Sequence, residues 1–262
     1  MRVNKEIGEK SNFLRYPVDS PRPIRYNSTM GNESTCLLCQ CQIKENTIFF
    51  DLTDEQLNCF KDVVRNSTSR KKEVIYLEEE PCTGFYVIRS GRVKLVRSSR
   101  EGKEQILKIL GAGELFGMEV FHEEKKHTTT AVAMDDSALC FIGKKDFFSI
   151  LEREPSIARK VIIALSRELN QAYEKIGSMG LMSARGKMAH LLSSLASEYG
   201  TVENGMVRLN LNLSRIEIAE LLGITQETSI RLLKSFQKEG LIDIKRKEII
   251  IRSLDKLNET GE

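Results

Sequence analysis

The sequence lacks the long apolar runs that would place the chain in a membrane. None of its apolar runs approaches the roughly 20 residues that a helix needs to span a bilayer, so we expect no membrane partner. The first residues also lack the apolar core of a secretory signal, which favours a cytoplasmic location. A large excess of positive charge is missing too: a formal net charge of +3 is too small to indicate nucleic-acid binding by itself.

Residues typical of catalytic sites are also few. The histidines are His122, His127 and His190, and we interpret each as a surface or packing residue rather than a ligand. An enzyme with a metal site in a cupin barrel would need several histidine or glutamate side chains that converge on the metal. The sequence also lacks a phosphate-binding glycine loop and a catalytic serine–histidine–aspartate pattern. We therefore expect a protein that is not an enzyme.

The strongest positive signal lies in residues 213–241, which have the pattern of two short helices joined by a tight turn. Ser214 and Thr225 are placed to cap the two helices, and Gly223 supplies the turn between them. This is the layout of a helix-turn-helix, whose second helix enters the major groove of DNA. The alternative interpretation is an ordinary helical hairpin with a solvated charged face.

The second helix has one charged face and one apolar face at the helical period. Gly240 ends this helix, and residues 241–252 then alternate like two strands around the basic turn Lys245-Arg246-Lys247. A basic hairpin after a recognition helix is typical of a wing that contacts the phosphate backbone, so the pattern favours a DNA-binding module. The candidate DNA-binding residues are Gln226, Glu227, Ile230, Arg231, Lys234 and Lys245.

Short strands are predicted between Val74 and Ile142, where apolar and polar residues alternate in runs separated by glycines. Such strands with glycine corners at near-regular spacing indicate a sandwich or barrel of jelly-roll type. Before this region, Thr53-Asp-Glu-Gln56 resembles a capping box that opens a short helix. Residues 1–35 are polar and irregular, which indicates a mostly disordered tail.

A long helix is predicted to begin near Pro155, a residue that suits the first turn of a helix. Its apolar residues recur with alternating steps of four and three, the pattern of a two-stranded parallel coiled coil. A helix packed on its own sheet usually shows a wider apolar stripe, so we favour a homodimer seam over an internal helix. Gly177 and Gly180 indicate a hinge before a DNA-binding segment that opens near Ser183. The predicted seam consists of Ala158, Ile162, Leu165, Leu169, Ala172, Ile176 and Met179.

The order of these segments, together with three motifs, resembles the CRP/FNR family of bacterial transcription regulators. The motifs are Tyr86-Val-Ile-Arg-Ser-Gly-Arg-Val-Lys-Leu95, Gly113-Glu-Leu-Phe-Gly117 and Glu227-Thr-x-x-Arg231, and the likeness covers about Ile48 to Leu254. The resemblance implies an α+β protein with an N-terminal double-stranded β-helix (a cupin-like jelly roll) as sensor, a long dimerisation helix and a C-terminal winged helix-turn-helix. The expected divisions are a disordered tail (1–35), a cysteine-containing segment (36–47), the sensor (48–150), the dimerisation helix (151–182) and the DNA-binding domain (183–262).

The resemblance also bears on what the sensor detects. Members that bind cyclic nucleotides hold the phosphate with an acid after the Phe-Gly corner and with an Arg-Ser pair somewhat later. Here the corner reads Phe116-Gly-Met-Glu119, with a shifted acid, and the later site reads His127-Thr-Thr-Thr-Ala131, without the arginine. A phosphate there would lose its charge-assisted bidentate partner, so we expect no cyclic AMP.

The oxygen-sensing members bind an iron–sulfur cluster through a cysteine group just before the β domain and one distant cysteine. Cys36-Leu-Leu-Cys39-Gln-Cys41 lies at the place of the group, and Cys140 lies at the position of the distant ligand. Four thiolates suit a cysteine-ligated cluster, so the resemblance implies a 4Fe-4S cluster at these residues. The sequence departs from the family at Thr47, where a third proximal cysteine is usual, and Cys41 would have to replace it.

Other interpretations of the thiols stay open at this point. In a cytosolic protein, cysteines are packing residues, metal ligands or redox sensors rather than structural disulfides. The proximal cysteines could instead form a redox-switching pair or a zinc site, and Cys140 on an alternating strand is otherwise a core residue. Cys59 and Cys82 are interpreted as incidental. The main alternative is a regulator of the same fold that senses a haem-bound gas or an organic effector.

In either version, the resemblance implies a homodimer that binds an inverted-repeat promoter site on double-stranded DNA, with RNA polymerase as a further partner.

Overall fold

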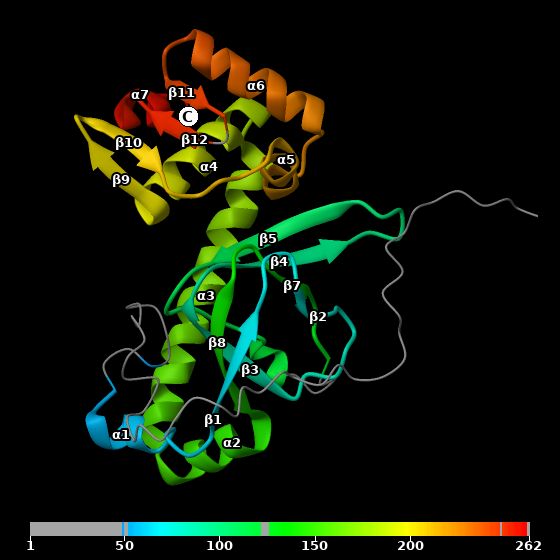
Figure 1. Ribbon diagram of the computed structural model, residues 1–262, viewed down its shortest axis with the longest axis vertical. Helices are drawn as coiled ribbons and strands as arrows, with labels where there is room; N and C mark the ends of the chain where they lie inside the picture. Colours follow the sequence, from blue (N-terminus) through cyan, green and yellow to red (C-terminus); the bar gives the residue numbers. More distant parts are fainter. Residues whose placement is uncertain (1–48, 50–51, 122–125, 247, 261–262) are drawn as a thin grey trace, which may run out of the picture.

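The computed structural model describes residues 49, 52–121, 126–246 and 248–260. They form a β-roll, a long helix and a winged helix-turn-helix, in that order along the chain (Figure 1). The predicted tail and the segment with Cys36, Cys39 and Cys41 lie outside the described residues, as do His122 and Lys247. Among the described helices, none combines the length and apolarity needed to cross a bilayer.

The β-roll consists of two four-stranded antiparallel sheets. Its strands are β1 (Val64–Ser69), β2 (Val74–Tyr76), β3 (Gly84–Ser90), β4 (Val93–Ser98), β5 (Glu104–Leu110), β6 (Leu115–Phe116), β7 (Thr130–Ala133) and β8 (Ser137–Gly143). One sheet has the order β1-β8-β3-β6 and the other has the order β2-β7-β4-β5. Gly91 turns the chain from β3 into β4 with a φ of 86°, at a place where a Cβ would collide with Ser137. The predicted jelly-roll architecture is confirmed.

Three helices and a short 3₁₀ helix, η2 (Met118–Phe121), accompany the roll. α1 (Asp54–Asn58) begins with the predicted capping box, in which the Thr53 and Gln56 side chains each accept a hydrogen bond from the other residue's backbone N–H. α2 (Lys144–Arg153) was not predicted, and it spans the expected division at residue 150. α3 (Pro155–Leu181) begins at the predicted proline.

One apolar core of the roll, called here the Cys140 core, joins the β-strands to α2 and α3. Its buried residues are Phe49, Phe60, Cys82, Phe85, Val87, Val120, Cys140, Ile142, Phe147, Ile150, Ile157 and Val161. Phe85 and Phe147 meet edge to face, with ring centroids 4.7 Å apart. Ile157 and Val161 come from α3, so this core fixes one face of the long helix against the roll.

The C-terminal part combines four helices with a third antiparallel sheet, of order β11-β12-β10-β9. The elements are α4 (Ala184–Tyr199), β9 (Gly200–Glu203), β10 (Met206–Leu209), α5 (Arg215–Leu222), α6 (Gln226–Lys238), β11 (Ile242–Lys245), β12 (Glu248–Ile251) and α7 (Leu254–Glu259). Ser183, Ser214 and Thr225 cap α4, α5 and α6. The predicted helix-turn-helix and wing are therefore confirmed, whereas the β9–β10 hairpin was not predicted.

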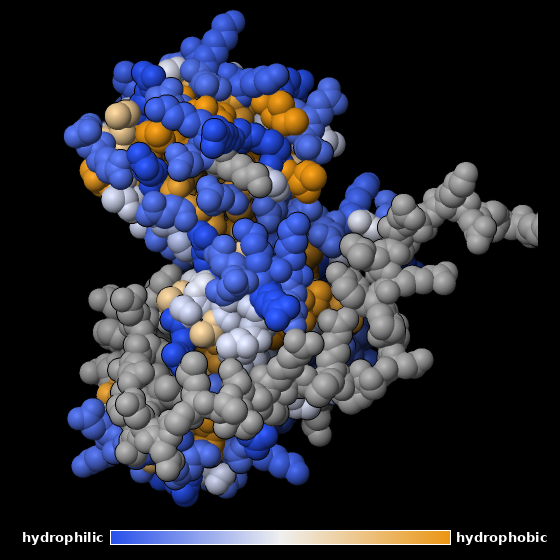
Figure 2. Space-filling model, in the orientation of Figure 1, coloured by the Kyte–Doolittle hydropathy of each residue, from blue (hydrophilic) through white to orange (hydrophobic). Residues whose placement is uncertain are grey.

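The β4–β5 strand pair connects the roll to the C-terminal part. Lys94 Nζ on β4 lies 3.7 Å from a carboxylate oxygen of Glu217 on α5. Arg92 donates a hydrogen bond of 2.7 Å to the carbonyl oxygen of Asn210. Figure 2 shows the molecule as two lobes with a narrower middle, where this contact lies. The apolar core that crosses the contact includes Val96, Ile106, Ile109, Ile218 and Leu222.

Gly223 provides a test of the turn between α5 and α6. Its φ of 66° lies in the left-handed region. A residue with a Cβ adopts this conformation only at a cost of about 1–2 kcal/mol. We expect Gly223→Ala to lower the free energy of unfolding by about that amount. The matched control is Gly177→Ala in α3, where an added Cβ meets nothing within 4 Å. Because alanine favours a helix over glycine, this substitution should raise the free energy of unfolding by about 1 kcal/mol. Calorimetric melting of both variants measures the two opposite shifts. A Gly223→Ala protein as stable as its parent would contradict this turn geometry.

Candidate DNA interface and sensor elements

Helix α6 presents one face to solvent and the other to the protein interior, at the end of the molecule shown at the top of Figure 1. Ser229, Leu233 and Phe236 are buried, as predicted for the packing face. The opposite face carries the exposed side chains of Gln226, Glu227, Arg231, Lys234 and Lys238, with Ile230 half-buried among them. A guanidinium on such a face can bind guanine O6 and N7 together, and a carboxylate can accept from cytosine N4.

Contacts at both ends fix the position of α6. At its start, the Thr225 hydroxyl accepts a hydrogen bond of 3.2 Å from the backbone N–H of Thr228. At its end, Arg185 of α4 lies over the ring of Phe236, 4.7 Å from the centroid, and donates a hydrogen bond of 3.0 Å to the Glu239 carboxylate. That hydrogen bond is the main cause that lowers the pKa of Glu239. The recognition helix is thus held against α4 rather than left as an isolated element.

The β11–β12 hairpin forms the predicted wing. Lys245 and Arg246 are exposed at its tip, and Arg246 turns the chain with a φ of 57°. Asp243 accepts two hydrogen bonds from Arg252, of 2.8 and 2.9 Å, and the pKa of its carboxyl is lowered by these bonds. Because this acid already has a cationic partner, the tip itself presents positive charge. Exposed amines and guanidinium groups at such a tip suit contacts to DNA phosphates.

The predicted dimer seam lies along α3 as an exposed apolar stripe. Ile162 is 67% exposed, Leu169 51% and Ile176 66%. Leu165 and Ala172 are also exposed, Ala158 is half-buried, and the side chain of Met179 lies outside the described part of the chain. A continuous apolar stripe of this kind on a folded surface marks an interaction site. Its heptad spacing suits a second copy of the same helix.

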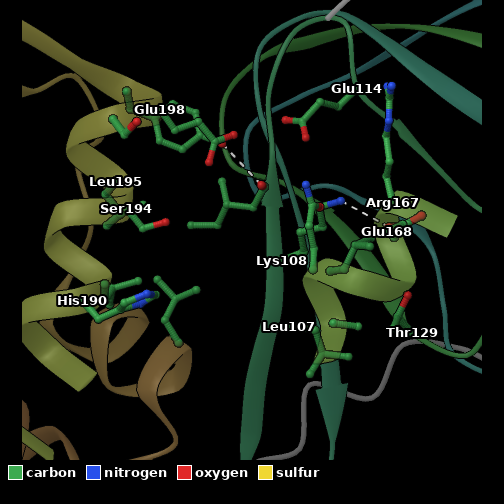
Figure 3. Close-up of a pocket in the computed structure, with 18 of the residues that line it drawn as sticks. Leu107, Lys108, Glu114, Thr129, Arg167, Glu168, His190, Ser194, Leu195 and Glu198 are labelled. Carbon is green, nitrogen blue, oxygen red and sulfur yellow. Dashed lines mark hydrogen bonds and ion pairs between the residues drawn. The ribbon is translucent and has the colours of Figure 1, made fainter. Parts of the chain in front are cut away.

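A cavity of about 990 Å³ lies beside this stripe, between β5, α3 and α4 (Figure 3). Leu165 and Ala172 belong both to the stripe and to the cavity wall. Lys108 of β5 and Glu168 of α3 form an ion pair of 3.2 Å at its edge. His190 faces the cavity from α4 and is exposed, as the sequence predicts for a surface histidine. The seam, the roll and the DNA-binding part therefore meet around one cavity.

Cys140, the predicted distant cluster ligand, is fully buried in β8. Across the sheet it pairs with Asn66 of β1 and with Val87 of β3. Phe49, which follows the cysteine-containing segment in the chain, is 2% exposed and belongs to the Cys140 core. Phe49, eight residues after Cys41 in the sequence, thus lies in the core that contains Cys140.

The corner expected for a nucleotide phosphate carries an acid with threonine neighbours. Glu119 accepts hydrogen bonds of 3.3 and 2.9 Å from the backbone N–H and the hydroxyl of Thr128. Burial by itself raises the pKa of Glu119, but the side chain of His127 and the bonds from Thr128 lower it to about 2. The carboxylate is therefore ionised at neutral pH, and residues 127–131 supply no arginine that would offset its charge beside a phosphate.

The structure also brings together residues that the sequence did not connect. His127 is buried and stacks on Tyr76, which fits the packing role predicted for it. Cys82, interpreted as incidental from the sequence, lies beside Glu119 and His127. No spacing signals this contact, because the three residues belong to separate segments of the roll.

Two family models match the chain. The cyclic nucleotide-binding domain matches residues 68–154, and the Crp-like helix-turn-helix domain matches residues 186–260. The electron transport regulator A of Shewanella oneidensis is 30% identical over 219 residues, which cover 83% of this chain and 87% of that protein. The anaerobic regulatory protein of Haemophilus influenzae is 28% identical over 223 residues, which cover 84% of this chain and 86% of that protein.

A solved structure agrees with the fold. FixK2 from Bradyrhizobium japonicum superposes with a TM-score of 0.68 at 24% identity, over 76% of this chain and 98% of that one. The β-roll, the long helix and the winged helix-turn-helix thus occur together in a known architecture. With the relatives, this shows that the chain belongs to the CRP/FNR family, in its FNR-like branch, and is a DNA-binding transcription regulator rather than an enzyme.

Proposed function

We propose that this regulator senses oxygen or redox state through a 4Fe-4S cluster held by Cys36, Cys39, Cys41 and Cys140. The name of the anaerobic regulatory protein motivates the proposal. The chemistry of the donor set supports it, because three clustered thiols and one further thiol are the ligands that such clusters use. When bound, the cluster would supply the redox-active group for this response.

The position of Phe49 carries the proposal. Phe49 packs in the Cys140 core, and a fully extended chain from Cys41 to Phe49 spans at most about 29 Å. The proximal thiols are therefore tethered to the core that contains the distant one. Without that tether, three cysteines near the start of the chain would have no structural link to Cys140.

The same core connects the sensor to dimerisation. Ile157 and Val161 of α3 pack in the Cys140 core, whereas Ile162 and Leu169 point to solvent along the seam. A cluster that links Cys36, Cys39 and Cys41 to Cys140 would thus act on the core against which α3 packs. A more stable dimer places two α6 helices on one DNA, which raises affinity through effective concentration.

In this proposal the homodimer binds an inverted-repeat promoter site whose half-sites are centred about 10–11 base pairs apart. Arg231 contacts a guanine, Glu227 accepts from a cytosine, and Ile230 contacts a thymine methyl group. Gln226, Lys234 and Lys245 complete the interface, and RNA polymerase is the further partner at the promoter.

The alternative is a regulator of the same fold that responds to another effector, or to thiol oxidation or zinc, without a cluster. A brown protein that contains iron and sulfide after anaerobic purification distinguishes the two.

The seam is tested by Leu165→Asp. This change places a charge in the predicted interface, at a cost on the order of several kcal/mol, so we expect monomers by analytical ultracentrifugation and much weaker DNA binding. Asn170→Asp is the control, since Asn170 lies on the outer side of the same helix and is exposed. A Leu165→Asp protein that stays dimeric and binds DNA normally would show that the seam is elsewhere.

The cluster ligands are tested by serine substitution under anaerobic conditions. We expect Cys140→Ser to lose the bound iron and sulfide, because it removes one of four thiolates. Cys59→Ser and Cys82→Ser are the matched controls and should keep full cluster content. Full iron and sulfide in the Cys140→Ser protein would reject the assignment. A cluster retained in Cys41→Ser would indicate a ligand other than cysteine.

The DNA interface is tested with two substitutions, one expected to change base preference and one expected to change affinity for all sequences. Arg231→Ala should cost about 1–3 kcal/mol per half-site and remove most of the preference for the contacted guanine. Lys245→Ala should weaken binding to all sequences alike and flatten its salt dependence. Binding titrations against sites with substituted guanines, at several salt concentrations, measure both effects. Unchanged base preference in Arg231→Ala would show that another face reads the DNA.

A further inference from the structure

Three potential metal ligands of different chemistry meet inside the β-roll, at the Cys82–Glu119–His127 triad. One ligand atom from each of these residues lies within 4.8 Å of the other two. Cys82 and His127 are each 4% exposed, and the Glu119 side chain is 15% exposed. The triad joins the segment after β2, the helix η2 and the segment before β7, so only the folded roll assembles it.

Two of these ligand atoms lack a hydrogen-bond partner among the described residues. They are Glu119 Oε2 and His127 Nδ1, both buried, which face each other as an ion pair of 3.6 Å, beyond hydrogen-bond distance. The other carboxylate oxygen, Oε1, takes both hydrogen bonds from Thr128. Buried polar atoms are normally satisfied, and buried charges are normally paired or coordinate metals. A cation between Glu119 and His127 would satisfy both atoms at once.

The neighbours of the triad hold the ligands in place. The ring of Tyr76 stacks on the imidazole of His127, with centroids 3.6 Å apart and planes 6° from parallel. Cys82 Sγ lies 3.5 Å from the carbonyl oxygens of Gly84 and Gly117. These contacts fix the positions of the imidazole ring and of the protonated thiol in the roll.

We propose that Cys82, Glu119 and His127 form a binding site for a divalent transition-metal ion of the Zn²⁺ type. A thiolate together with an imidazole favours Zn²⁺ over Mg²⁺ or Ca²⁺, which prefer oxygen ligands. Three protein ligands leave the fourth tetrahedral position to water. Metal–ligand distances of about 2.0–2.3 Å set ligand separations near 3.5 Å. Glu119 Oε2 and His127 Nδ1, 3.6 Å apart, already have about this separation, so the main movement on binding would be that of Cys82 Sγ toward them.

The protonation state of Cys82 is consistent with exchange of its thiol proton for a metal ion. Burial, and then the nearby charge of Glu119, raise the pKa of the Cys82 thiol to about 11, so the thiol is protonated without a metal. On binding, the S–H bond breaks, a metal–sulfur bond forms, and the proton leaves to solvent. The ion would replace that proton and neutralise the charge that Glu119 brings into the roll.

The site is independent of the proposed iron–sulfur cluster, and the test keeps the two apart. The protein used is the full chain with Cys36→Ser, Cys39→Ser and Cys41→Ser, so that these thiols cannot compete for metal. Zn²⁺ is titrated against a chromogenic chelator, and Co²⁺ serves as a spectroscopic probe of thiolate ligation. We expect one Zn²⁺ per chain, a sulfur-to-cobalt charge-transfer band and a higher melting temperature with metal.

Matched substitutions assign the ligands. Cys82→Ser, Glu119→Gln and His127→Gln should each weaken Zn²⁺ binding by more than the roughly 10–100-fold that loss of an outer contact costs, and Cys82→Ser should abolish the cobalt band. Cys59→Ser and His190→Gln are the controls and should bind like the parent. If the His127→Gln protein unfolds, the Zn²⁺ affinities of Glu119→Gln and Cys82→Ser decide whether the triad binds the metal. The absence of stoichiometric Zn²⁺ binding would overturn the proposal and leave Glu119 and His127 as a plain ion pair. Binding unchanged by all three substitutions would also overturn it.

Discussion

The packing of α3 against the β-roll is the contact on which the other functional elements depend. Ile157 and Val161 anchor the start of this helix in the Cys140 core, and this anchor directs its heptad stripe outward. The far end of α3 leads through the Ser183 cap into α4, against which the recognition helix α6 is fixed by Arg185. This one helix thus contributes to the Cys140 core, carries the predicted dimer seam and leads into the helix that supports α6. Under the proposed function, a change at the Cys140 core would act on α6 through α3 and α4.

A second contact holds the DNA-binding part against the roll. The β4–β5 strand pair shares an apolar core with α5, and Lys94 lies near Glu217 on the same helix. Movement of the helix-turn-helix away from the roll would expose this core and separate these charges. The cavity between β5, α3 and α4 marks where the packing is incomplete, beside the seam residues Leu165 and Ala172. The orientation of α6 relative to the seam is therefore set by apolar packing as well as by the linker after α3.

Within the roll, the corner that could receive a phosphate has acquired a different chemistry. The ionised carboxylate of Glu119, the imidazole of His127 and the thiol of Cys82 meet there. With no arginine in residues 127–131 to offset it, this carboxylate opposes an anionic ligand, whereas this set of donors attracts a cation. The roll therefore keeps the shape of a cyclic nucleotide-binding domain while its polar interior favours a different ligand class.

The sequence by itself determined the elements whose signals are local. The signals for the caps at Ser214 and Thr225, for the turn at Gly223 and for the helix that begins at Pro155 each depend on neighbouring residues. These four features were found where predicted. The α2 helix and the β9–β10 hairpin were missed, because short amphipathic segments resemble the strands and turns around them. Only the tertiary structure decided that Phe49 enters the core of Cys140, and that Cys82 and His127 lie together at Glu119. Side chains from separate segments meet through sheet pairing and core packing, which no spacing along the chain encodes.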